Sequence, residues 1–270
     1  MPVLGAVNRM RSVRLRLLTL ALLPLVVLLP VLLGVTMWRW IDKFDDLLIS
    51  KVASDLRIAE QYFNTLEITQ ATEVRALAQS VEFARASAES PRAVSALLSQ
   101  ESVRRDLDFL FVQRKSEPEA PPAFQEIAER ATPEQPSAGV AVLDSDVLAA
   151  LDAELAERAT LPLVATEAAR TINSELETRG MVILVASHIP NSDSVLIGGR
   201  LLNRDLSIID TMNALVYRER SDIDARTGTT TLFLDDVRIS TNVRLFEGER
   251  ALGTRVSEVV FDQVMGRGEP

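Results

Sequence analysis

Polar side chains of the kinds that hold small ligands gather at one turn near the C-terminus. Asp236, Arg238, Thr241 and Asn242 lie on or beside this turn, between two short apolar runs. An arginine can grip a carboxylate through two parallel hydrogen bonds, and hydroxyl and amide groups can fix the orientation of a small molecule. We therefore predict that these four residues bind a small organic ligand. The alternative is that Asp235 and Asp236 shape the turn and that Asn242 caps nearby backbone groups.

A second polar group precedes the apolar run that begins at Met181. Arg170, Thr171 and Arg179 lie on the segment that enters this run. Their side chains suit the same carboxylate and hydroxyl chemistry, so we predict that they are ligand-binding residues as well. The alternative is that their charges and hydroxyl are solvated in a loop.

Residue types for catalysis or metal binding are sparse. His188 is the only histidine, and it lies in His188-Ile-Pro-Asn rather than beside an acid on a helix, as a phosphoacceptor would. There is no cysteine, which excludes disulfides and thiolate metal sites. Gly198, Gly199 and Arg200 make no phosphate-binding loop and fit a strand end that needs a permissive backbone. We expect no catalytic residue, no metal and no cofactor.

The charge balance argues against a nucleic-acid partner. The net charge of the 270 residues is −9, although residues 1–39 carry five arginines and no acid. The chain beyond residue 39 is therefore more acidic than the whole, and it would repel nucleic-acid phosphates. The composition of 47% hydrophobic and 25% charged residues is sufficient for one or two folded domains.

The N-terminal apolar stretch predicts a transmembrane helix at 17–38. This stretch holds no charge and would extend roughly 33 Å as a helix, close to the ~30 Å hydrocarbon core. Trp38 and Trp40 resemble an interfacial belt, and the upstream arginines place residues 1–16 in the cytoplasm. We expect one pass through a bacterial inner membrane, contact with its lipid bilayer, and an extracytoplasmic location for the rest. A cleaved signal peptide would have a shorter apolar region.

The next segment, residues 41–90, has no glycine or proline and predicts one long helix. Apolar or small residues recur in it at spacings of three and four, as in one face of a helix. Unbroken, it would extend on the order of 75 Å, long enough to line the seam of a homodimer. A helix that packs on its own sheet is the alternative, and we expect both uses together.

The remaining chain alternates between helix and strand patterns. Residues 115–138 are rich in proline and are interpreted as a mobile excursion without chemistry, with one helical turn around 124–130. Asp235 and Asp236 mark the turn of a hairpin. The second sheet has too few strands for an independent core, so we expect it to be incomplete. The predicted strands are 107–112, 139–143, 161–165, 181–187, 194–199, 229–234 and 237–243, and the predicted helices are 93–106, 145–158, 204–218 and 256–265.

Four stretches carry a resemblance to double Cache sensor domains of bacterial receptors. They are 231–245 (TLFLDDVRISTNVRL), 250–257 (RALGTRVS) after Gly248, 177–186 (ETRGMVILVA) and 198–203 (GGRLLN). The resemblance implies an α+β fold in which two PAS-like Cache modules with antiparallel sheets stand on a long helix. The membrane-distal module would be 91–202, and 203–270 would be a connecting helix and a partial membrane-proximal module.

The same resemblance implies the function. Such receptors sense small organic ligands outside the cytoplasm, most often in the distal module, and signal across the membrane. We expect the chain to be the sensor part of a two-component histidine kinase, truncated before a second membrane helix. The alternatives are the sensor part of a methyl-accepting chemoreceptor or of a cyclic-dinucleotide enzyme, and a stand-alone anchored binding module.

Overall fold

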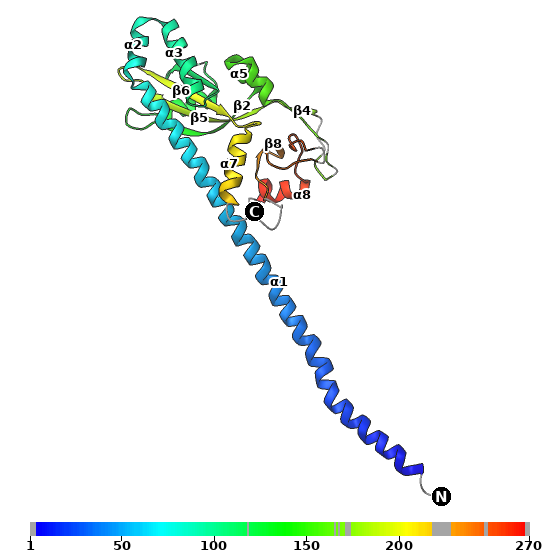
Figure 1. The fold of residues 1–270 in the computed structure, drawn as a ribbon. Coiled ribbons are helices and arrows are strands. Elements are labelled where there is room, and N and C mark those ends of the chain that lie inside the picture. The colour runs from blue at the N-terminus through cyan, green and yellow to red at the C-terminus, as the bar shows by residue number, and fades with distance from the viewer. Residues whose placement is uncertain are drawn as a thin grey trace. The chain divides into compact units, whose positions relative to one another are not determined.

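The computed structural model describes residues 4–117, 119–164, 166, 168–170, 174–217, 228–245 and 248–267 (Figure 1). The chain divides into two compact units, residues 1–57 and 58–270. The described residues of the first unit, from Leu4 onward, belong to helix α1 (Leu4–Ala78). The second unit holds all strands of the described residues, together with the end of α1 and the other helices.

No helix in the described part of the chain combines the length and apolar character needed to cross a membrane. The prediction of a transmembrane helix at 17–38 is therefore wrong.

Helix α1 ends at Ala78, earlier than the single helix predicted over 41–90. The Ser80 hydroxyl accepts a hydrogen bond from Phe83 N at 3.0 Å and begins α2 (Val81–Glu89). The Ser90 hydroxyl likewise accepts from Ala93 N at 3.1 Å and begins α3 (Pro91–Arg104). Serine at an N-cap supplies a partner to an otherwise unpaired backbone N–H. The apolar periodicity continues through Gln79 and Ser80, so it does not reveal this break.

A four-stranded antiparallel sheet is the centre of the second unit. The strand order is β1-β6-β5-β2, and every neighbouring pair is antiparallel. This confirms the predicted α+β class with antiparallel sheets. The strands are β1 (Phe109–Arg114), β2 (Ser137–Leu143), β5 (Gly180–His188) and β6 (Ser194–Leu201).

The sheet is buried on both faces. Along β5, Val182 and Leu184 pack in one cluster with helices α4 (Pro122–Arg130), α5 (Ser145–Leu151) and α6 (Ala153–Ala159). Ile183 and Val185 pack in a second cluster with α1, α3 and α7 (Leu206–Val216). Alternate residues of a strand point to opposite faces, which explains this division. Each fully buried aliphatic side chain contributes about 1.5–3 kcal/mol.

Gly199 of β6 lies directly opposite Phe109 of β1 in the sheet register. A Cβ atom at Gly199 would come within 2.1 Å of Phe109 Cζ. The Phe109 ring is buried against Phe111 and Phe124, at centroid distances of 6.1 and 6.2 Å, so it has no free space to move into. Glycine at 199 is therefore needed for the ring to cover the strand.

The C-terminal part contains the predicted hairpin, as strands β7 (Thr231–Leu234) and β8 (Val237–Thr241). Asp235 in its turn has a φ of 53°, a conformation that aspartate tolerates. Three residues form its buried apolar cluster, Leu161, Leu234 and Ile239. The other elements are β3 (Leu161–Pro162), β4 (Leu176–Glu177), α8 (Glu258–Phe261) and a π-helical turn, Asp262–Gly266.

Candidate ligand-binding site

The sequence-predicted residues Arg170 and Asp236 lie in one ion-pair cluster with Arg255. Asp236 pairs with the Arg255 guanidinium, and both side chains are only 6% exposed. Arg170 Nη2 lies 4.0 Å from Asp236 Oδ2, and the Arg170 guanidinium lies 3.7 Å from the centroid of the Phe261 ring. Arg255 Nη1 also donates to the Arg170 carbonyl at 2.6 Å. The cluster joins the segment before β4 to the segment after β8.

Arg179 lies in a second ion-pair cluster. Its Nε and Nη2 donate to the two carboxylate oxygens of Glu177 at 2.9 and 2.8 Å, and Nη2 also donates to Asp235 Oδ2 at 2.8 Å. Burial on its own raises the pKa of Glu177, but the hydrogen bonds and charge of Arg179 outweigh it and lower that pKa. The carboxylates of Glu177 and Asp235 raise the pKa of Arg179.

The predicted binding residues of the hairpin form hydrogen bonds within the hairpin and with the segments beside it. Thr241 Oγ1 lies 2.6 Å from Thr231 Oγ1 across the strands. Asn242 accepts from Thr230 N at 2.8 Å through Oδ1 and donates to the Gly228 carbonyl at 3.1 Å. Arg238 Nη1 donates to Thr254 Oγ1 at 3.4 Å. Thr171 lies outside the described residues, and the ligand-binding role of all seven residues stays a prediction.

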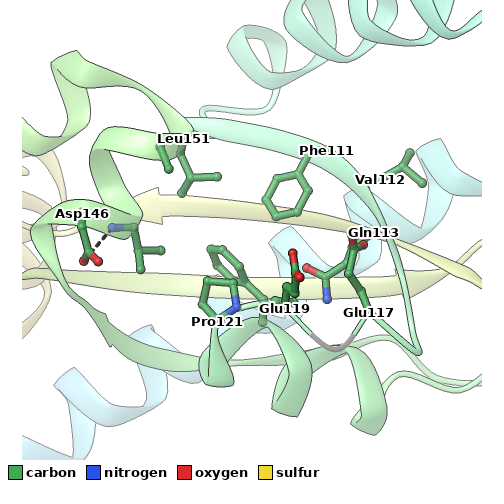
Figure 2. Close-up of a pocket in the computed structure, with 12 residues that line it drawn as sticks. Phe111, Val112, Gln113, Glu117, Glu119, Pro121, Asp146 and Leu151 are labelled. Atoms are coloured by element: carbon green, nitrogen blue, oxygen red, sulfur yellow. Dashed lines mark hydrogen bonds between the residues drawn. The ribbon is translucent and has the colours of Figure 1, made fainter.

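A cavity lies elsewhere, between the edge strand β1, the segment that follows it, α4 and α5 (Figure 2). We call it the α5 cavity. Its volume is about 580 Å³, within the range of about 300–1,000 Å³ typical of small-molecule sites. The residues that line it are Phe111, Val112, Gln113, Glu117, Glu119, Ala120, Pro121, Phe124, Asp146, Val147, Ala150 and Leu151.

Gln113 is the buried polar group of the α5 cavity. Phe109, Phe111 and Gln113 alternate along β1, so they share the face that turns toward α4 and α5. Gln113 is only 5% exposed, and its Nε2 has no hydrogen-bond partner among the described residues. A buried donor without a partner costs about 1–3 kcal/mol, so a ligand that accepted from it would recover this energy.

Aromatic and acidic side chains make up the rest of the wall. The rings of Phe111 and Phe124 lie edge to face, 5.4 Å apart between centroids. Figure 2 shows Glu117 and Glu119 at the same end of the cavity as Gln113, with Asp146 at the other end. No Lys, Arg or His is among the residues that line it. In the described part of the chain, no group of three or more His, Asp or Glu side chains could hold a metal ion.

A second depression lies on the other side of β1, and we call it the α3 cleft. Its volume is about 750 Å³, and it is bounded by α2, α3, β1 and the turn between β5 and β6. It shares Phe111 and Val112 with the α5 cavity. Serine, asparagine, proline and apolar residues line it, and none of its lining residues carries a charge.

Sequence reasoning missed the α5 cavity because it assigned residues 115–138 no chemistry and ended the first strand at 112. The strand continues to Arg114, and the helical turn expected around 124–130 is the longer helix α4, Pro122–Arg130. One sequence feature could have indicated the site. Gln113 continues the alternation of Phe109 and Phe111, so it is a polar residue at an inward position of an apolar strand.

Comparison with known proteins supports one part of the sequence interpretation directly. Residues 200–270 match the sequence model of the family described as Single cache domain 3. This match confirms the resemblance to Cache extracytoplasmic sensor domains and supports extracytoplasmic sensing and signalling as the role of the chain. A comparison with curated protein sequences finds no match.

Among solved structures, the chain is similar to the periplasmic domain of LuxQ from Vibrio cholerae. The sequence identity is 9%, and the match covers 74% of this chain and 82% of that one, with a TM-score of 0.42. A likeness at this level establishes neither the ligand nor the output of this chain.

Proposed function

We propose that the chain is an extracytoplasmic sensor that binds a small organic molecule in the α5 cavity. The observation that carries the proposal is the buried Gln113 amide, whose Nε2 lacks a partner within a cavity of ligand size. A buried polar group without a partner is rare in folded proteins and asks for an explanation, and a bound ligand would provide one. The Cache match of residues 200–270 supports the sensing role.

The fold offers a continuous route from the cavity to the C-terminal part. Strand β1 borders the cavity and pairs with β6, and β6 leads through Asn203 and Asp205 into α7. Asn203 is fully buried and bonds Met181 N, the Ala159 carbonyl and the Arg179 carbonyl at 2.9–3.0 Å. A ligand that moved β1 would thus move β6 and the connection from β6 to α7, which the hydrogen bonds of Asn203 hold in place.

The cavity assignment is tested by blocking the cavity. The full-length chain is screened by thermal unfolding against small amines, carboxylates and neutral polyols, as wild type and as Ala150→Phe. Ala150 lines the cavity from an exposed position of α5, so the larger ring fills the site without entering the core. Ala149→Phe, on the same helix but outside the cavity lining, is the matched control.

Binding at 100 times the Kd stabilises a protein by about 2.7 kcal/mol. In a chain of this size each kcal/mol raises Tm by about 2–4 °C. We expect at least one compound to raise the Tm of wild type and Ala149→Phe but not of Ala150→Phe. A Tm increase that survives in Ala150→Phe would place binding elsewhere, and the absence of any increase would contradict the proposal.

We also propose, on the resemblance to Cache receptors, that the output is a histidine kinase. A methyl-accepting chemoreceptor, a cyclic-dinucleotide enzyme and a stand-alone binding module are the alternatives, and the reading frame beyond codon 270 separates them. Homodimerisation remains a proposal of the same kind. Val52 and Leu56 are exposed and four residues apart on α1, so replacing both with glutamate should reduce the mass measured by light scattering if two copies pair there.

A further inference from the structure

We infer that the ligand of the α5 cavity is a small organic cation that also carries a hydrogen-bond acceptor. This inference rests on the proposed function, because it names the chemical class of the molecule held at that site. Three features carry it: the sign of the lining charge, the unpartnered amide of Gln113, and the aromatic wall.

The charges that line the cavity are all negative. Glu117, Glu119 and Asp146 contribute carboxylates, and no lining residue is basic. None of the three carboxylates forms an ion pair with another described residue. An anionic ligand would meet three like charges and no basic side chain, whereas a cation would meet carboxylates that lack a counter-charge.

The amide of Gln113 requires a hydrogen-bond acceptor in the ligand, which the carboxylates do not require. Its Nε2 is a donor, and it is buried at the end of the cavity where Glu117 and Glu119 lie (Figure 2). Carboxylates can hold the positive group of a ligand, but Nε2 needs a carbonyl, carboxylate or hydroxyl oxygen. A cation without an acceptor would leave this buried donor unpaired and would bind more weakly.

The aromatic wall suits the same class. Phe111 and Phe124 meet at an interplanar angle of 68°. A cation is attracted to the face of an aromatic ring within about 6 Å of its centroid. The α3 cleft provides the contrast within the same sheet, because it contacts Phe111 as well but has a neutral lining. Of these two depressions, only the α5 cavity has charged side chains in its lining.

The test compares three probes of nearly equal shape: tyramine, a cation; tyrosol, its neutral alcohol counterpart; and 4-hydroxyphenylacetate, an anion. All three carry a phenol oxygen that can accept from Gln113. Binding to the full-length chain is measured by isothermal titration calorimetry at low ionic strength. We expect tyramine to bind at least about tenfold more tightly than tyrosol, and we expect no binding of 4-hydroxyphenylacetate.

Variants separate the charge from the acceptor. The triple variant Glu117→Gln/Glu119→Gln/Asp146→Asn removes every charge of the cavity lining, and it should weaken tyramine about tenfold and leave tyrosol unchanged, because all three acids are exposed and only their charge is removed. Glu129→Gln, an exposed acid of α4 that does not line the cavity, is the matched control and should change neither. Gln113→Met should weaken tyramine and tyrosol by the same factor.

The outcomes distinguish this inference from the proposed function. If tyramine binds no more tightly than tyrosol, or not at all, the cation assignment is wrong. The proposed function survives that result if another compound still stabilises the wild type and loses this effect in Ala150→Phe. If no compound depends on position 150, both fail together.

Discussion

The four-stranded sheet and the C-terminal hairpin are held by different forces. The sheet is covered on both faces by large apolar clusters, whereas the hairpin has a buried apolar cluster of only three residues. Around the hairpin, ion pairs add to the hydrogen bonds described above, with Arg255, Arg179 and Arg250 bound to Asp236, Asp235 and Asp210. The sheet should therefore respond to changes of side-chain volume, and the hairpin to changes of charge.

The largest effect is expected at the buried pair between Asp236 and Arg255. Arg255→Met leaves the Asp236 carboxylate buried without its main partner, which should cost about 3–5 kcal/mol in the hairpin. Amide hydrogen exchange should show faster exchange at Val237–Thr241, with little change at β5. Replacing both partners, as in Asp236→Leu/Arg255→Met, should restore much of the protection. Equal loosening of β5 in the single variant would contradict the separation of the two regions.

A somewhat smaller effect is expected in the sheet. Leu184→Ala removes a side chain that is buried in the cluster beneath α4 and α6, and it should lower the free energy of unfolding by about 2–5 kcal/mol. Urea unfolding measures this change, and raising the salt concentration should not alter it. Val142→Ala, at an exposed position of β2, should change stability by less than about 0.5 kcal/mol.

The pH dependence should come from carboxylates at the junction of the two regions. Burial on its own raises the pKa of Asp205, but its bonds to Arg200, Ser207 and Ile208 N together lower it, as Arg179 does for Glu177. A carboxyl group whose pKa is lower in the folded state stabilises the fold at every pH above its unfolded-state pKa. This stability is lost as the pH falls through the folded-state pKa.

The ordinary pKa values are 3.8 for Asp205 and 4.5 for Glu177, so stability should fall progressively below about pH 4.5. Unfolding midpoints between pH 7 and pH 3 measure the loss. Asp205→Asn and Glu177→Gln should be less stable at pH 7 but should lose less on acidification. An identical pH profile for wild type and both variants would show that other groups are responsible.

The smallest effect is expected at an exposed ion pair. Arg250 binds Asp210 through two bonds of 2.9 Å, but the Asp210 side chain is 52% exposed. Asp210→Asn should cost about 0.2–1 kcal/mol at low salt. The difference between variant and wild type should nearly vanish in 1 M salt, where exposed charges are screened. A cost near that of Arg255→Met would mean that exposure does not decide the strength of these pairs.

The same contrast explains what the sequence could predict. The strands of the sheet have apolar alternation or continuous apolar runs, so residues 181–187 and 194–199 were located to within a few positions of β5 and β6. The hairpin was predicted from Asp235 and Asp236 at its turn. Such patterns depend only on residues close together in the chain, so they can be recognised without knowledge of the tertiary structure.

The candidate site depends on contacts that no local pattern contains. The α5 cavity brings together β1, the segment after it and α5, which are separated in sequence. Each polar residue that was selected from the sequence and that the structure describes makes at least one intramolecular contact, as Arg179 does with Glu177 and Asp235, although Nε of Arg170 and Nε of Arg238 have no partner among the described residues. Residue type shows which groups can bind a ligand, but only the fold shows which of them, like Gln113, lack a partner.

The contact between Phe109 and Gly199 has a consequence for how this protein can change over generations. Any side chain at 199 would collide with the ring, so a lineage that loses this glycine must first replace the phenylalanine with a smaller residue. The two positions are 90 residues apart in the chain, but a substitution at one limits which residues are possible at the other. Homologous sequences should therefore vary at 109 and 199 together, with glycine retained wherever the aromatic ring is retained.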